Sequence, residues 1–239
     1  MVKFLLILFL IFSSGGLLAF HSSTEEALLQ RAAQWGPRDA QILFKDYSRE
    51  FWQGVQNGRR GPRPTEHEIL MITDSIIEGF NTHRSMPEIM ESWGRLSGRL
   101  LQLCDPAVNG SIDLSRKRIS SDFDELVRWK QKKIPVIFYG FSPSFFKGDR
   151  LGYLHDLSRN QKEWMDLLWF DYRRLGQGES YRSFDDRGNA FGVVSLSLNR
   201  TFTTLLHFWY YIWQQAGGRM GPLRLSMTPD SILVVDHGY

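Results

Sequence analysis

The sequence predicts a mainly α-helical protein, a single-domain multi-helix bundle with a long buried C-terminal helix and little strand. Two observations predict this class: apolar residues recur at spacings of three and four over most of the chain, and helix-capping sequences precede several of these runs. With 239 residues, of which 42% are apolar, the chain can build one substantial core. We therefore expect one domain over residues 20–239, after a leader at residues 1–19.

Residues 1–19 have the composition of a secretory signal peptide. Lys3 supplies a positive start, Phe4 to Phe12 form an apolar stretch, and Leu17-Leu18-Ala19 provides a cleavage site. The mature chain would then begin at Phe20. This predicts an exported protein, located in the periplasm or outside the cell.

Three helices are expected before residue 82. The first begins with a capping box at Ser23 and ends where Gly36 precedes a proline. The second runs from about Arg38 to Asn57, where an Asn-Gly pair is typical of a helix C-terminus. The third begins with a second capping box at Thr65 and carries isoleucines on one face.

The clearest helix is expected to begin at Ser85, where Ser85 and Glu88 form another capping box with a proline in the first turn. Two adjoining apolar stripes predict that this helix is buried on more than one side. Gly94 and Gly98 lie one turn apart and lower helix propensity, so we expect another backbone to approach closely there. Asp105 and the following proline end the helix.

The second half contains three further helices and two extended segments. The helices are expected at about 116–132, from Ser158 to Gly176, and over residues 189–216. Residues 134–141 are apolar and β-branched but too short for a helix, so we expect an extended segment there. Residues 232–235 are the segment that would pair with it.

The last helix is almost uncharged, with Arg200 as its ionised residue, and its apolar residues predict burial on most sides. A membrane span is the competing interpretation, but many polar side chains interrupt the stretch. These are Ser195, Ser197, Asn199, Arg200, Thr201, Thr203, Thr204 and His207. We therefore expect no membrane span after removal of the leader.

The net charge of the chain limits the kinds of partner that we expect it to bind. A formal net charge of +3 suits an anionic surface or substrate without requiring one, and nucleic-acid binding is not indicated. Cys104, the single cysteine, cannot form a disulfide within the chain, and its place on an apolar stripe predicts a buried thiol.

The sequence GRLS at residues 94–97, followed by Pro106, resembles the zinc-dependent phospholipase C and S1/P1 nuclease superfamily. In that superfamily a buried helix reading G-[RK]-[LV]-[SA]-H-x-x-x-D carries metal ligands, and a following P-x-H supplies another. Here Gly98, Gln102 and Val108 occupy the three ligand positions. The resemblance therefore covers the helical frame and not these ligands.

The resemblance also implies where a reduced metal site would lie. A second ligand helix of the superfamily reads H-x-x-x-E, and the best register places Ser120 at the histidine and Asp124 at the glutamate. An N-terminal aromatic residue contributes its free amine in these enzymes, so Phe20 would occupy that place. The candidate ligands of a single divalent ion, with zinc as the implied metal, are Phe20, His21, His67, Asp122 and Asp124.

Two functions follow as hypotheses. The first is a non-catalytic envelope protein that keeps the helical frame, needs no cofactor, and binds a partner protein or an anionic surface. The second is a metal-dependent phosphodiesterase or phospholipase with a rearranged site. The absence of histidine at Gly98, Val108 and Ser120 favours the first.

Overall fold

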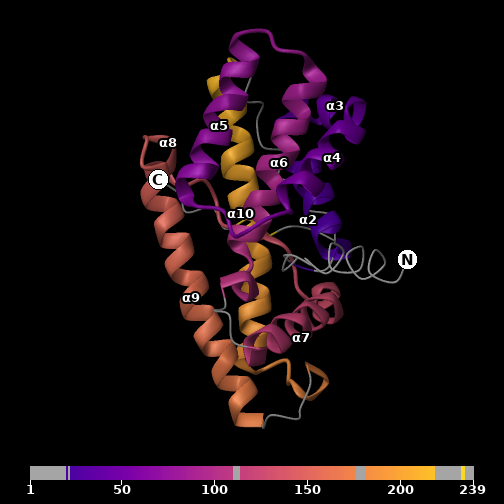
Figure 1. Ribbon diagram of the computed structural model, residues 1–239, viewed down its shortest axis with the longest axis vertical. Coiled ribbons are helices and arrows are strands. Elements are labelled where there is room, and N and C mark those ends of the chain that lie inside the picture. Colours follow the sequence, from indigo (N-terminus) through magenta and orange to yellow (C-terminus); the bar gives the residue numbers. More distant parts are fainter. Residues whose placement is uncertain (1–19, 21, 110–113, 176–180, 219–232, 235–239) are drawn as a thin grey trace, which may run out of the picture.

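The computed structural model describes residues 20, 22–109, 114–175, 181–218 and 233–234 (Figure 1). The helices of its first half are α2 (Ser22–Trp35), α3 (Arg38–Asp46), α4 (Ser48–Gly58), α5 (Glu66–Asn81) and α6 (Met86–Cys104). The second half has α7 (Leu114–Lys130), α8 (Pro143–Phe146), α9 (Arg150–Leu175) and α10 (Asn189–Gln215). The shorter elements are the 3₁₀ turns η1 (Pro106–Asn109), η2 (Gln131–Lys133) and η3 (Tyr181–Ser183), and the strands β1 (Ile137–Phe138) and β2 (Leu233–Val234). The predicted fold class, a mainly α-helical bundle with little strand, is confirmed.

Helix α10 runs through the middle of the bundle, with α9 along one side and α2, α5 and α6 packed on it (Figure 1). Every residue from Thr201 to Tyr210 is buried, so the helix is enclosed on all sides over that stretch. The prediction of a long buried C-terminal helix is confirmed. Among the described residues, no helix is long and apolar enough to cross a membrane, as expected for this stretch.

Helices α4 and α6 approach each other through glycines. Gly54 and Gly58 of α4 lie against Gly94 and Gly98 of α6. At each of the four, an added β-carbon would lie 2.5 Å or less from a backbone oxygen of the other helix. The close backbone approach expected at Gly94 and Gly98 is therefore confirmed, and its partner is a second glycine pair with the same spacing.

The helix predicted from Arg38 to Asn57 is divided in the structure. Tyr47, with φ −114° and ψ 33°, separates α3 from α4. Because the chain changes direction there, Phe44 and Phe51 both contact Trp209, with ring centroids at 4.5 and 5.9 Å. Packing against the centre of the bundle has overridden the continuous helical periodicity of the sequence.

The extended segment that contains β1 lies along α10. Three polar side chains of α10, spaced four residues apart, accept hydrogen bonds from its backbone N–H groups. The pairs are Ile137 N to Asn199 Oδ1 at 2.7 Å, Tyr139 N to Thr203 Oγ1 at 3.1 Å, and Ser142 N to His207 Nε2 at 3.1 Å. Four helical residues advance about 6 Å, close to the roughly 6.6 Å of two extended residues, so the two repeats match from Ile137 to Tyr139. The next donor, Ser142, follows after three residues. Strand β1 also pairs in parallel with β2, which confirms the predicted pairing of the two extended segments.

The helix start predicted at Ser158 is wrong. Helix α9 begins at Arg150 instead of Ser158, with Asp149 Oδ1 accepting from Gly152 N at 3.0 Å in its first turn. Ser158 lies inside the helix, and its hydroxyl donates to Glu66 of α5. A Ser-x-x-Gln sequence therefore caps nothing here, because its serine is used in a contact between helices.

Candidate functional site

Phe20 and Asp105 meet in the interior. The backbone nitrogen of Phe20 donates to Asp105 Oδ2 at 2.9 Å, and Ala107 N donates to Asp105 Oδ1 at 2.8 Å. Phe20 and Asp105 are both 0% exposed. The sequence places Asp105 here because it ends α6 directly before the proline that starts η1. Phe20, a predicted metal ligand, is thus hydrogen-bonded to Asp105, which the sequence predicted only as the end of a helix.

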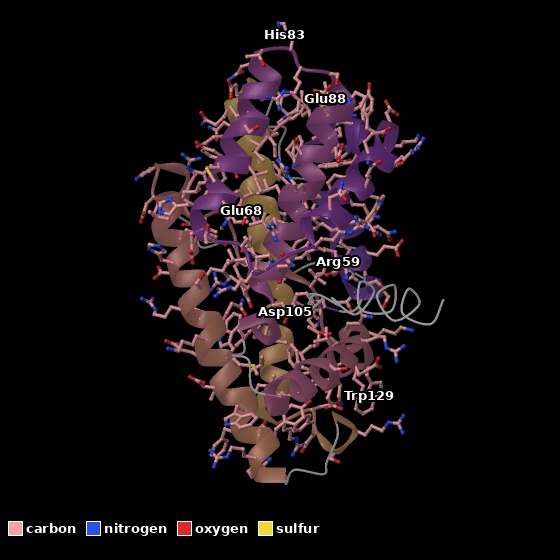
Figure 2. All side chains as sticks on the ribbon, in the orientation of Figure 1. Arg59, Glu68, His83, Glu88, Asp105 and Trp129 are labelled. Atoms are coloured by element: carbon pink, nitrogen blue, oxygen red, sulfur yellow. The ribbon has the colours of Figure 1, made fainter. Side chains whose placement is uncertain are left out.

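Two further carboxylates and one arginine surround this contact. Glu25 of α2 is 1% exposed and forms an ion pair with Arg59, with Arg59 Nε 2.8 Å from Glu25 Oε2. Asp124 of α7 is close enough to Asp105 for their charges to interact. We call Glu25, Asp105 and Asp124 the acidic cluster. Figure 2 marks Arg59 and Asp105 at mid-height of the bundle.

Burial dominates the electrostatics of the acidic cluster. It raises the pKa of Glu25 to about 9, although the charge of Arg59 lowers that pKa and the neighbouring carboxylates raise it. Burial also raises the pKa of Asp105, while its hydrogen bonds from Ala107 and Phe20 lower it. The pKa of Asp124 is raised by burial and by the charge of Asp105. Strongly perturbed carboxylates in one place mark this cluster as the first candidate site.

The structure brings together only part of the predicted metal site. Phe20 and Asp124 both lie at the acidic cluster, whereas Asp122 accepts a hydrogen bond from Tyr172 of α9. His67 is exposed on α5, and His21 lies outside the described residues. Within the described ranges, no three His, Cys, Asp or Glu side chains are arranged as the ligands of a metal ion.

Sequence reasoning missed Glu25, Arg59 and Asp105. Arg59 follows the Asn-Gly pair in a short basic stretch, where solvent exposure is the ordinary expectation, yet its side chain is 11% exposed in the ion pair with Glu25. Of these three residues, only Glu25 stands in a recognisable local pattern, an acidic side chain in the first turn of an amphipathic helix. That pattern predicts an interaction with the helix dipole and not a buried cluster. The contacts that assemble the cluster join residues far apart in the chain, which no local pattern reports.

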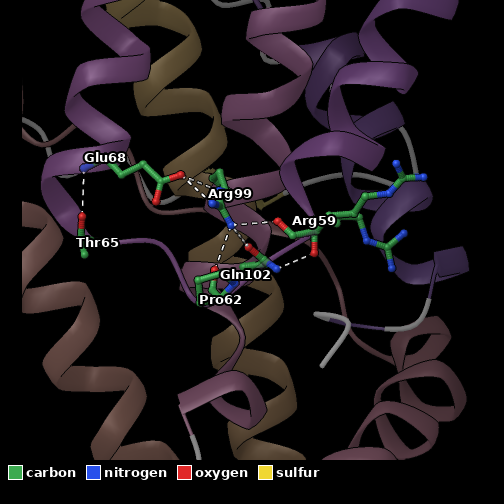
Figure 3. Close-up of polar contacts among 7 residues, drawn as sticks. Arg59, Pro62, Thr65, Glu68, Arg99 and Gln102 are labelled. Atoms are coloured by element: carbon green, nitrogen blue, oxygen red, sulfur yellow. Dashed lines mark hydrogen bonds and ion pairs between the residues drawn. The ribbon is translucent and has the colours of Figure 1, made fainter. Parts of the chain in front are cut away.

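A second polar network surrounds Arg99 of α6 (Figure 3). Its guanidinium binds Glu68 Oε1 at 2.7 to 2.8 Å, the carbonyl of Pro62 at 2.9 Å and Gln102 Oε1 at 2.9 Å. Gln102 Nε2 in turn donates to the carbonyl of Arg59 at 2.7 Å. These bonds hold the basic loop between α4 and α5 against α6.

The end of α7 forms a surface of different character. Trp129 is 47% exposed, and Lys130 Nζ lies 3.8 Å from the centre of its ring. Arg128, Lys132 and Lys133 are exposed beside it, and η3 packs against α7 in the same region. Figure 2 shows Trp129 towards the lower end of the bundle, away from Asp105. We call Arg128, Trp129, Lys132 and Lys133 the basic–aromatic face.

Acidic residues compensate only part of this charge. Asp186 binds Lys130 and Lys133, and hydrogen bonds from these two lysines lower its pKa. Residues 125–133 and 181–188 together hold six basic and three acidic side chains. The region is therefore net positive around an exposed indole ring.

Comparison with known proteins gave no match among protein-family models, curated proteins or solved structures.

Proposed function

We propose that this chain is an exported, non-catalytic protein that binds an anionic lipid surface of the cell envelope through the basic–aromatic face. The observation that carries the proposal is the half-exposed indole of Trp129 among exposed basic side chains. Tryptophan prefers the boundary between water and lipid, because its ring is apolar and its N–H is polar. Each basic residue near an anionic surface adds about 1 kcal/mol of attraction.

The residues that this chain has at the metal-ligand positions of the superfamily support a non-catalytic role. Gly98, at the histidine position, lies against the backbone of α4, where a side chain does not fit. Gln102, at the aspartate position, binds Arg99 and the carbonyl of Arg59. Both positions are therefore used to hold helices and a loop together. The carboxylates of Asp105 and Glu25 are buried, which favours a structural role for them over contact with a substrate.

The test is binding of the mature protein to vesicles of phosphatidylglycerol and of phosphatidylcholine, measured by co-sedimentation at low and high salt. We expect binding to phosphatidylglycerol, loss of that binding at high salt, and little binding to phosphatidylcholine. Trp129→Ala should weaken binding. Lys132→Glu changes the local charge by two and should weaken it by about 2 kcal/mol, on the order of thirtyfold.

Matched controls lie on α9. Phe170 is an aromatic residue that is 58% exposed there, and Lys162 is an exposed lysine of the same helix. Phe170→Ala and Lys162→Glu should leave vesicle binding unchanged. Equal loss of binding in these controls would assign the effect to overall charge or stability, and equal binding to both lipids would refute the proposal.

The alternative is a metal-dependent phosphoric-ester hydrolase with a rearranged site. It is favoured by one observation, the presence of Phe20 and Asp124 at the same acidic cluster. Such an enzyme would need further ligands and would be stabilised by its metal, so zinc should raise its melting temperature.

A further inference from the structure

We infer that cleavage between Ala19 and Phe20 places a new positive charge inside the protein, where the α-ammonium of Phe20 pairs with Asp105. The inference rests on the expected removal of residues 1–19 and not on lipid binding. Hydrolysis of this peptide bond consumes one water, leaves a carboxylate on Ala19 and frees the nitrogen of Phe20 as an ammonium. The nitrogen already lies 2.9 Å from Asp105 Oδ2.

The chemistry of this nitrogen changes on cleavage although its position need not. In the uncut chain it is an uncharged amide with one N–H, and that N–H is directed to Asp105. In the cut chain it carries a unit charge and three N–H donors. Its bond to Asp105 then joins two opposite charges, whereas in the uncut chain only the acceptor can be charged.

Among the described residues, the acidic cluster beside Phe20 holds more acidic than basic groups. The cation paired with Glu25 is Arg59. Its single positive charge faces the three carboxylates of the acidic cluster. Glu25 Oε1 and Asp124 Oδ1 are buried and have no hydrogen-bond partner among the described residues. One arginine is therefore shared among three carboxyl groups, and a buried carboxylate whose charge is only partly compensated destabilises a fold. An α-ammonium at Phe20 supplies a second cation at the place where it is needed.

The new N-terminus, Phe20, is buried. Phe20 is 0% exposed and belongs to the hydrophobic core, so its side chain fixes the position of its nitrogen. The pair with Asp105 joins the start of the mature chain to the end of α6, 85 residues later. We therefore expect the processed chain to be more stable than any form that retains residues before Phe20.

The test compares the processed chain, beginning at Phe20, with the same chain that retains Ala19. Each form is prepared as wild type and as Asp105→Asn. We expect the retained Ala19 to lower the melting temperature by several degrees in the wild type. A steric effect of Ala19 would persist in Asp105→Asn, whereas the loss of the ion pair would not, so the difference should shrink strongly in that background. Asp39→Asn is the control, because Asp39 is an exposed carboxylate of α3, and there the full difference should remain.

A second measurement does not depend on the stability of the Asp105 variant. In the folded processed chain, the amine of Phe20 should resist acetylation while exposed lysines react, and unfolding should remove this protection. Equal melting temperatures with and without Ala19, or an amine that reacts as fast as in the unfolded chain, would overturn the inference. An exported protein whose intact mass begins at another residue would also overturn it, and would leave the vesicle-binding result unaffected.

Discussion

The carbonyl oxygen of Val55 lies 2.5 Å from the point that a β-carbon on Gly98 would occupy. This oxygen belongs to the backbone of α4, so it cannot rotate away as the end of a flexible side chain would. The distance between α4 and α6 is therefore limited by backbone atoms, and glycine is the residue that permits it.

Gly98→Ala and Gly98→Leu should both destabilise the protein, by roughly 1–3 kcal/mol, because the added atoms force α4 and α6 apart. This result would oppose helix propensity, which favours alanine over glycine by about 1 kcal/mol. Gly192→Ala in α10 is the control, since nothing lies within 4 Å of its added β-carbon, and it should be neutral or stabilising. Chemical denaturation of the three variants measures the difference. A Gly98 variant as stable as the wild type would mean that the two helices can separate freely.

Two helix starts with similar sequences should respond differently to alanine. Thr65 Oγ1 accepts a hydrogen bond from Glu68 N at 3.1 Å, whereas the side chain of Ser85 makes no capping bond although its sequence predicts one. Thr65→Ala should therefore lower the free energy of unfolding by about 1 kcal/mol. Ser85→Ala should change it by a few tenths at most, roughly the effect of an ordinary surface substitution. Urea midpoints of the two variants decide, and equal losses would show that both residues act as caps in solution.

His207 should make the protein sensitive to acid. It is 2% exposed, and burial lowers its pKa from 6.5 to about 4, with a smaller effect of the Arg200 charge in the same direction and an opposing one from the Gly140 carbonyl. Between these two values the unfolded chain binds a proton that the folded chain does not. The stability that His207 contributes is therefore present above pH 6.5 and is lost as the pH falls towards 4, by up to about 3 kcal/mol.

The measurement is the free energy of unfolding of wild type and His207→Gln at pH 7, 5.5 and 4.5. The variant should be less stable at pH 7, because the contacts of His207 with the segment around Gly140 and Ser142 are altered. Its stability should nevertheless decline less than that of the wild type as the pH falls. His67→Gln changes an exposed imidazole and should keep the wild-type profile. Parallel profiles for wild type and His207→Gln would rule out this origin of acid sensitivity.

Zinc should leave the melting temperature of the mature protein unchanged in the wild type, in His21→Ala and in His67→Ala. The physical reason is that His67 is exposed on α5, whereas Asp105 is buried in the acidic cluster. A site filled at a hundred times its dissociation constant would add about 2.7 kcal/mol, which thermal unfolding detects easily. Stabilisation of the wild type that disappears in either variant would instead support the hydrolase. Stabilisation that survives both substitutions would place the metal elsewhere.

The sequence predicted those parts of the fold that local patterns encode. The apolar residues of α10 recur at helical spacing, and Gly94 with Gly98 lowers helix propensity in a way that only close packing explains. The break at Tyr47 and the start of α9 at Arg150 were missed for a shared reason. In both places the local pattern allows a continuous or later helix, and contacts with distant residues decide.

The acidic cluster was less accessible to prediction than the fold. The sequence pointed to Phe20 and Asp124, but through a resemblance and not through any sign that they meet. The local sequence at Asp105 predicts the end of a helix, and the local sequence at Arg59 predicts a basic loop. Whether these residues form one cluster depends on how α2, α4, α6 and α7 pack. The spacing of apolar residues within one segment does not predict that packing.

The hydrogen bonds of Asn199, Thr203 and His207 to the extended segment should also limit self-association of the protein. Residues 136–139 are apolar, β-branched or aromatic, and uncharged, a composition typical of segments that form intermolecular β-sheet. Successive N–H groups of an extended chain point to opposite sides, so β1 presents one edge to α10 and the other to β2. A helix thus occupies the place of a neighbouring strand, and in the part of the chain that the structure describes both edges of β1 are covered. Replacing Asn199 and Thr203 by alanine would therefore be expected to show itself first as aggregation, before any large loss of helix.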